Sequence, residues 1–164
     1  MSSFNKSLYP SLAVGYMVLP ESLADLYTRA RWLASDQAPT QIQAALGDFI
    51  ESGQLDRHVK RMKAIYARRR RTLVNAIEEH LAGTASIDGD ISGLSVKIRL
   101  HTGLDDDELI QAALESGIAL TSTRSFYTRN SPTGEFLLGY GNMTEQKIKN
   151  AVALLARTLQ NLGV

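Results

Sequence analysis

A single run of helical periodicity, from residue 54 to residue 82, sets the strongest limit on the fold of this chain, and it ends at Gly83. At 100° per residue, its apolar positions fall within a stripe about 60° wide, and basic residues fall on the opposite side. The stripe holds Leu55, Val59, Met62, Tyr66, Leu73 and Ile77, and the opposite side holds Arg57, Lys60, Arg61, Arg68 and Arg71. A helix of this kind packs on one face only, so the rest of the chain must complete its core.

The segments before this helix are short. Residues 14–20 form a run of strand-forming residues closed by Pro20, and helical spacing of apolar residues follows over 21–33. Pro39 and Thr40 suit the start of another helix, and Gly53 suits its end.

The segments after the long helix predict a small sheet with helices packed against it. Alternation with glycine turns predicts a strand or a hairpin over 86–100, with its main strand at 94–100. Residues 105–117 predict a helix that starts with acidic side chains, which complement the helix dipole. Two further strands are predicted over 118–123 and 135–141, and a final helix is predicted with Thr144 as its cap. The second half is therefore predicted as a β-α-β-β-α unit.

Composition excludes several classes of protein. The chain has 164 residues, of which 44% are hydrophobic, and a formal charge of +1, so one soluble globular domain without a general attraction to polyanions is expected. No apolar run approaches the roughly 20 residues of a membrane span, and no secretory signal is visible. There are no cysteines, which suits a reducing compartment, so we predict a cytoplasmic protein without a membrane partner.

Metal and nucleotide motifs are missing from the sequence. His58, His80 and His101 have no second ligand at metal spacing, so no metal site is predicted. The stretch Asp88 to Asp90 lacks the other ligands of a calcium loop and is interpreted as a turn. No nucleophile elbow and no Walker loop is present.

The basic run 57–71 has two interpretations. Its arginines could contact the phosphates of a nucleic acid, since guanidinium groups bind phosphate through two hydrogen bonds. The regular apolar stripe of the same run, and the lack of a neighbouring helix-turn-helix pattern, favour a solvated outer face or a subunit contact.

A different chemistry is suggested by "SSFNKSLYPSLAVGYMVLP", from Ser2 to Pro20. A lysine can form an imine with an aldehyde, and the phosphate of pyridoxal phosphate needs hydroxyl or amide groups around it. Lys6 has the hydroxyls of Ser3 and Ser7 close to it along the chain.

This stretch resembles the Schiff-base segment of fold type I pyridoxal-phosphate enzymes. It most resembles the MocR/GabR family, in which a GntR-type DNA-binding domain is joined to an aminotransferase-like domain and the pattern is approximately G-T-F-S-K-[ST]-L-x-P-x-[LI]-R-[LI]-G-Y. The resemblance continues through 38–73, 93–100 and 136–159, so it covers essentially the whole chain. The residues that fit the pattern are Phe4, Lys6, Ser7, Leu8, Pro10, Leu12, Gly15 and Tyr16.

The resemblance implies an α/β fold class, the small C-terminal domain of a fold type I aminotransferase with a fragment of the large domain that binds pyridoxal phosphate. It implies a fragment of the cofactor domain over 1–53, a connecting helix over 54–82 and a small α/β domain over 83–164.

The resemblance also implies roles for individual residues. Lys6 would be the internal-aldimine lysine, Ser3 would contact the cofactor phosphate, and Ser7 would be a second neighbour of that phosphate. Arg124 is the candidate for binding the carboxylate of the substrate, and an ordinary surface arginine is the open alternative.

Two departures from the family pattern limit these roles. Ala13 stands where the family has an arginine that reaches the phosphate. The chain begins five residues before Lys6, so we expect it to correspond to the C-terminal third of such a protein, without the DNA-binding domain, the glycine-rich phosphate loop, the stacking aromatic ring and the aspartate that pairs with the pyridine nitrogen.

In the intact parent, an amino acid or amine would exchange onto the aldimine at Lys6, either for transamination or for effector sensing in a transcriptional regulator. DNA would be bound only through the absent N-terminal domain. The isolated chain is expected to be weak or inactive as an enzyme, and to expose apolar surface to the missing N-terminal region or to a further copy of itself. The alternatives are a nucleic-acid-binding module that uses residues 57–71 and a truncated inactive scaffold.

Overall fold

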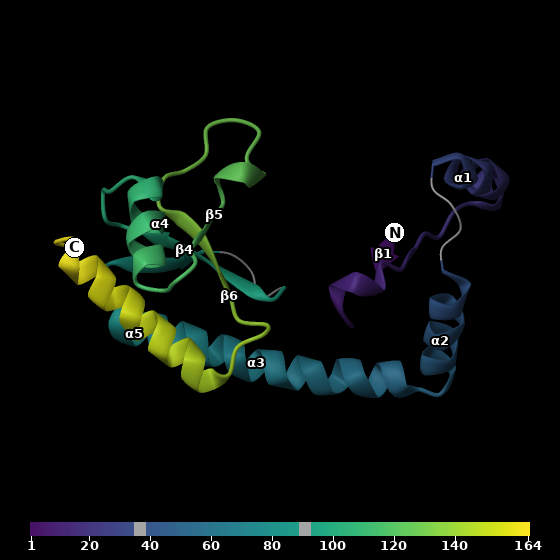
Figure 1. The fold of residues 1–164 in the computed structure, drawn as a ribbon, viewed down its shortest axis with the longest axis horizontal. Helices are drawn as coiled ribbons and strands as arrows, with labels where there is room; N and C mark the ends of the chain where they lie inside the picture. The colour runs from purple at the N-terminus through teal and green to yellow at the C-terminus, as the bar shows by residue number, and fades with distance from the viewer. Residues whose placement is uncertain (35–38, 89–92) are drawn as a thin grey trace. The chain divides into compact units, whose positions relative to one another are not determined.

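The computed structural model describes residues 1–34, 39–88 and 93–164, which divide into two compact units (Figure 1). Unit 1 comprises Met1–Met62 and unit 2 comprises Lys63–Val164. Of the helices in these ranges, none has the combined length and apolar character that a membrane span requires.

Unit 1 begins with two very short strands. β1 (Ser2–Ser3) pairs antiparallel with β2 (Gly15–Tyr16), and one 3-10 turn, η1 (Pro10–Leu12), lies between them. The strand predicted over 14–20 is therefore limited to two residues. A strand extends only as far as its hydrogen-bonding partner, and β1 offers two positions.

The helices of unit 1 follow their predicted positions. α1 (Glu21–Ala34) contains no buried residue, and in α2 (Thr40–Glu51) only Leu46 is buried. Gly53 has a positive φ of 68°, which ends α2 in the way expected of a glycine after a helix.

The long helix α3 (Gln54–His80) confirms the periodicity of the sequence. Leu73, Ala76 and Ile77 are buried, while the five basic residues predicted on the opposite face are exposed. Gly83 follows with a φ of 80°.

The sheet of unit 2 has the strand order β3-β4-β6-β5, with every neighbouring pair antiparallel. β4 alternates, so that Val96, Ile98 and Leu100 are buried while Lys97 and Arg99 lie on the other face. Of the strand and the hairpin predicted over 86–100, the structure has the hairpin, formed by β3 and β4. The turn predicted at Asp88 to Asp90 extends into residues that lie outside the described ranges. The strands are β3 (Ala85–Asp88), β4 (Ser95–Leu100), β5 (Thr121–Ser122) and β6 (Glu135–Gly139).

Two capped helices complete unit 2. Asp105 precedes α4 (Asp106–Glu115), and its Oδ1 accepts a hydrogen bond of 2.8 Å from the Asp107 amide. Thr144 precedes α5 (Glu145–Asn161) and accepts from the Lys147 amide at 3.3 Å, as the sequence predicts.

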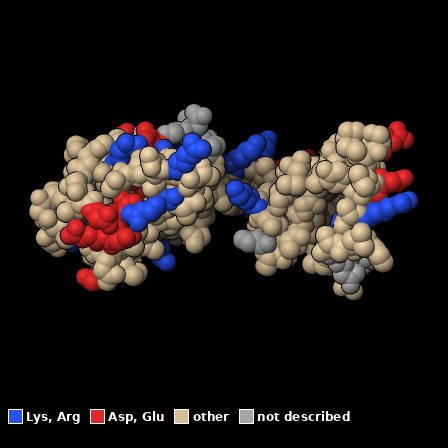
Figure 2. Space-filling view, turned by 90° about the horizontal axis from the view of Figure 1, so that it is seen from above, with Lys and Arg blue, Asp and Glu red and all other residues tan. Residues whose placement is uncertain are grey.

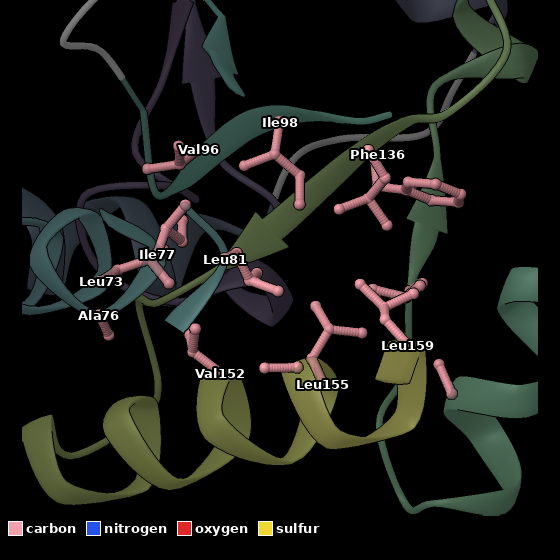
Figure 3. Close-up of a cluster of buried hydrophobic side chains, with 14 of the residues drawn as sticks. Leu73, Ala76, Ile77, Leu81, Val96, Ile98, Phe136, Val152, Leu155 and Leu159 are labelled. Carbon is pink, nitrogen blue, oxygen red and sulfur yellow. The ribbon is translucent and has the colours of Figure 1, made fainter. Parts of the chain in front are cut away.

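One hydrophobic core joins these elements. Val152, Leu155 and Leu159 of α5 point toward the apolar face of the sheet and toward the second half of α3 (Figure 3). Phe136 and Ile98, on neighbouring strands, are 0% exposed at its centre. The apolar face of the sheet is thus covered by helices, and its other face carries the polar residues discussed below.

Candidate functional site

The segment with Lys6 is a closed turn between β1 and β2. Ser3 pairs with Gly15, and the Phe4 amide donates to the Val14 carbonyl at 3.0 Å. A Cβ atom at position 15 would lie 2.8 Å from the carbonyl oxygen of Ser2, closer than real Cβ contacts allow. Glycine is therefore needed at this position for the turn to close.

Lys6 lies at the tip of this turn. The amides of Ser7 and Leu8 both donate to the Phe4 carbonyl, at 3.2 and 2.9 Å, and this curls the chain around residues 4–8. The Lys6 side chain is exposed, and no described residue forms an ion pair or hydrogen bond with its amine. The amine is thus available to a ligand, but the described residues do not desolvate it.

The two predicted phosphate ligands take part in the turn itself. Ser3 Oγ accepts from the Asn5 amide at 3.1 Å and donates to the Val14 carbonyl at 3.4 Å. Ser7 Oγ donates to the Phe4 carbonyl at 3.1 Å. A hydroxyl has one proton to donate, so each serine must release a backbone carbonyl before it can donate to a phosphate.

The fit of this turn to pyridoxal phosphate is good at one end of the cofactor and incomplete at the other. The Lys6 amine suits the aldehyde, and Asn5 Oδ1 is a buried acceptor that has no partner among the described residues, as expected where a further donor binds. Ala13 adds no charge near the phosphate. It has a φ of 51°, a left-handed conformation that is uncommon for a residue with a side chain and that is often found at functional sites.

His58 connects this turn to the first turns of α3. Its Nε2 lies 2.9 Å from the Ser7 carbonyl oxygen, and since a carbonyl can only accept, Nε2 carries the proton. From the sequence, His58 is a candidate only for metal binding, and no metal site is predicted there. The contact of His58 with Ser7 is a tertiary feature that residue spacing does not reveal.

Arg124 belongs to unit 2 and lies in η2 (Arg124–Phe126), close to two carboxylates of α4. Its guanidinium is 3.3 Å from Asp107 Oδ2 and 3.6 Å from Asp106 Oδ2. The hydrogen bond with Asp107 raises the pKa of Arg124 further above its ordinary value. A substrate carboxylate would have to compete with these acids, which the sequence gives no sign of because they are 17 and 18 residues away.

The polar face of the sheet holds a buried carboxylate that sequence reasoning missed. Glu135 is 1% exposed, and it accepts hydrogen bonds from Tyr127 at 2.8 Å, Lys97 at 3.3 Å and Arg99 at 2.5 Å. Burial alone would raise the pKa of Glu135, but these hydrogen bonds outweigh it and lower the pKa from 4.5 to about 2. The available signal was the alternation of β4, which puts Lys97 and Arg99 on one face of a sheet, but the pairing of Glu135 with Arg99 depends on the register between β4 and β6.

The shifted pKa of Glu135 predicts acid sensitivity. A carboxyl whose pKa is lowered by folding stabilises the protein above the pKa of its unfolded state, and that contribution is lost as the pH falls from about 4.5 toward 2. The full shift corresponds to about 3 kcal/mol at most, and to less after screening, because Lys97 and Arg99 are partly exposed. Urea unfolding from pH 7 to pH 2 should show this loss in the native chain, and Glu135→Gln should lack it.

A suitable control is Glu145→Gln, since Glu145 pairs with Arg68 at 3.4 Å on the surface of the same unit and is half exposed. It should retain the acid-dependent loss of the native chain. Equal pH profiles for Glu135→Gln and the native chain would contradict the assignment.

The basic run 57–71 of α3 is partly engaged within unit 2. Arg68 pairs with Glu145, and Arg69 donates to the Gly141 carbonyl. The contacts of Arg68 and Arg69 support the interpretation of the second half of this basic run as a structural surface.

Within the described residues there is no group of three His, Cys, Asp or Glu side chains that could hold a metal ion.

Unit 1 carries a large exposed apolar surface. Leu26, Trp32 and Leu33 of α1 are 61, 71 and 79% exposed, and Val18 before the helix is 82% exposed. On the face shown in Figure 2, the part at the right that belongs to unit 1 is mostly uncharged. An exposed apolar surface of this kind is typical of a site that binds other protein.

Residues 2–155 match the family aminotransferase class I and II. Among curated proteins, the chain is 33% identical over 155 residues to the uncharacterized HTH-type transcriptional regulator YhdI of Bacillus subtilis, covering 94% of this chain and 33% of YhdI. It is 30% identical over 152 residues to the probable rhizopine catabolism regulatory protein MocR of Rhizobium meliloti, covering 93% of this chain and 31% of MocR. The chain thus spans about a third of the length of these relatives.

A solved structure shows the same fold. LysN, an alpha-aminoadipate aminotransferase from Thermus thermophilus complexed with N-(5'-phosphopyridoxyl)-L-leucine, has a TM-score of 0.87 and 22% identity, over 98% of this chain and 41% of LysN. This likeness confirms the predicted fold class, a small α/β domain with a fragment of the cofactor domain.

Proposed function

The chain belongs to the class I and II aminotransferase family, and we propose that it is the C-terminal portion of a MocR-type transcriptional regulator that binds pyridoxal phosphate at Lys6 and an amino compound at that cofactor. The single observation that carries this proposal is the closed β1–β2 turn, which presents the Lys6 amine, without a partner among the described residues, within a matching sequence pattern. The helix-turn-helix regulators among the relatives support the regulatory part of it.

Lys6, Ser3 and Ser7 would have different roles in binding the cofactor. Lys6 would hold the cofactor through its Nζ, and Ser3 and Ser7 would exchange their backbone acceptors for the phosphate oxygens. When bound, pyridoxal phosphate supplies an aldehyde, to which an amino compound can bind in place of the lysine, and a ring that withdraws electrons. Lys6 Nζ, once released, would be the base that accepts a proton.

The remaining roles concern the rest of the intact protein. We propose that residues 1–53 are the fragment of the cofactor domain, 54–82 the connecting helix and 83–164 the small domain. The preceding part of the parent, or another copy of the chain, would cover the apolar surface of α1 and add the phosphate and ring contacts that Ala13 and its neighbours do not supply. Arg124 would bind the carboxylate of the amino compound only after leaving Asp107.

Reductive trapping tests the role of Lys6. The chain is incubated with pyridoxal phosphate, reduced with borohydride and digested, and the pyridoxyl label is located by mass spectrometry. We expect Lys6 to be labelled several times more than the exposed Lys149, because Ser3 and Ser7 attract the phosphate to that turn.

Substitutions of Lys6, Lys149 and Ser3 sharpen this experiment. Lys6→Ala should lose the preferred label, whereas Lys149→Ala should keep it on Lys6. Ser3→Ala should lower the preference without changing the amine. Labelling that is spread evenly over surface lysines would contradict the proposal and leave an inherited, inactive scaffold.

A further inference from the structure

A polar hollow lies in unit 1, at the start of α3. It has a volume of about 350 Å³ and is lined by Phe49, Gln54, Arg57, His58 and Arg61. Binding sites for small organic molecules typically measure about 300–1,000 Å³, so this hollow has room for a small organic ligand. The proposed cofactor turn does not account for this hollow.

The charge of the hollow is positive and unbalanced. Arg57 and Arg61 are four residues apart on α3 and therefore lie on the same side of the helix. Both are exposed, and no carboxylate of the described residues forms an ion pair with either of them. Arg57 donates to the Ser52 carbonyl at 3.4 Å, which leaves most of its five donors unused.

Two like charges at this spacing destabilise a helix slightly, and an anion between them would reverse that effect. Guanidinium groups bind phosphate and carboxylate oxygens in pairs, and Gln54 adds an amide donor at the same hollow. Phe49 supplies an apolar wall, which favours a ligand with a hydrocarbon part over a bare inorganic ion.

The hollow is also connected to the Lys6 turn. His58 lines it and at the same time donates from Nε2 to the Ser7 carbonyl at 2.9 Å. A ligand that contacts the imidazole would therefore affect the hydrogen bond to Ser7, the residue that follows Lys6 in the chain.

We propose that this hollow binds an organic phosphate, which Arg57 and Arg61 hold by its oxygens and Phe49 contacts by its carbon skeleton, and that His58 transmits its occupancy to the Lys6 turn. The site is separate from the proposed cofactor turn, because its lining shares no residue with Ser3, Lys6 or Ser7.

Calorimetry with phenyl phosphate tests the site, with inorganic phosphate and phenol as the two halves of the probe. Phenyl phosphate should bind more tightly than either half. The double change Arg57→Gln and Arg61→Gln should weaken its binding about tenfold or more, since it removes two charge-assisted contacts. Arg71→Gln, at an exposed arginine of the same helix that lies outside the hollow, is the matched control and should leave the affinity unchanged.

Two further measurements distinguish this site from phosphate binding at the Lys6 turn and from nucleic-acid binding. Loss of phenyl phosphate binding in Ser3→Ala, with the arginine variants unaffected, would place the phosphate at the Lys6 turn and overturn the proposal. Binding of a short DNA duplex that depends on Arg57 and Arg61, without binding of phenyl phosphate, would overturn it in favour of nucleic acid.

The link to Lys6 has its own readout. Saturation with phenyl phosphate should shift the amide resonances of Ser7 and Leu8 in nuclear magnetic resonance spectra, and His58→Ala should remove these shifts while the arginines still bind the probe. Shifts that persist in His58→Ala would refute transmission through the imidazole. Circular dichroism checks that each variant keeps its helices.

Discussion

Replacing Phe136 by alanine is expected to lower the free energy of unfolding of unit 2 by about 3–5 kcal/mol. Phe136 is 0% exposed and lies in β6, opposite Ile98 of β4, at the centre of the core. Removing the ring takes away its apolar burial and leaves a cavity that the β-sheet cannot close, because neighbouring strands are held at a fixed spacing. Urea unfolding followed by circular dichroism measures this loss.

The same substitution at Phe126 serves as the control. Phe126 belongs to η2 of the same unit and is 69% exposed, so Phe126→Ala should change the unfolding free energy by less than about 0.5 kcal/mol. A similar loss at both positions would mean that the core does not have the described packing.

Gly134→Ala is expected to destabilise unit 2 by about 3 kcal/mol or more. Gly134 has a φ of 79°, which costs a residue with a side chain about 1–2 kcal/mol. The added Cβ would in addition lie 2.5 Å from the Leu100 carbonyl oxygen, a backbone atom that cannot move aside. The Gly134 carbonyl accepts from the Leu100 amide at 2.8 Å, so relief of the clash would break this hydrogen bond.

Gly103→Ala separates the two causes. Gly103 also has a positive φ, of 72°, but a Cβ there would meet nothing within 4 Å. This variant should show only the backbone cost of about 1–2 kcal/mol. The hydrogen-exchange rate of the Leu100 amide is a local measure of this clash. It should increase strongly in Gly134→Ala and little in Gly103→Ala. Equal destabilisation of both variants would contradict the close approach at Gly134.

The effect of Gly134 reaches the candidate substrate arginine. The Gly134 amide donates to Asp106 Oδ1 at 2.6 Å, and the other oxygen of Asp106 lies 3.6 Å from Arg124. A substitution at Gly134 is therefore expected to change the position of the Arg124 guanidinium through Asp106. Arg124 lies ten positions before Gly134 in the chain.

Much of the fold could be predicted because its signals are local. The stripe of α3, the cap at Thr144 and the alternation of β4 each depend on residues within a few turns or on one strand, and the structure confirms all three. The strand predicted over 14–20 was too long, because its length depends on β1, a partner that periodicity does not show.

The candidate site was predictable only as a list of residue types. Lys6 and Ser3 follow from the pattern of the segment, since their order along the chain is a property of the sequence. The hydrogen bonds that already engage Ser3 and Ser7, and the acids that hold Arg124, were not predictable, because they depend on distances across the fold.

The order of residues was thus sufficient to define the helices, the strands and the lysine with its family pattern, since these depend on backbone preferences and near neighbours. Only the folded chain decided that Glu135 is buried and ionised, that His58 contacts the Lys6 turn, and that Arg57 and Arg61 form no ion pair with an acid of the described residues. Burial and the pairing of charges depend on which distant segments meet, and electrostatic energies change steeply with that distance.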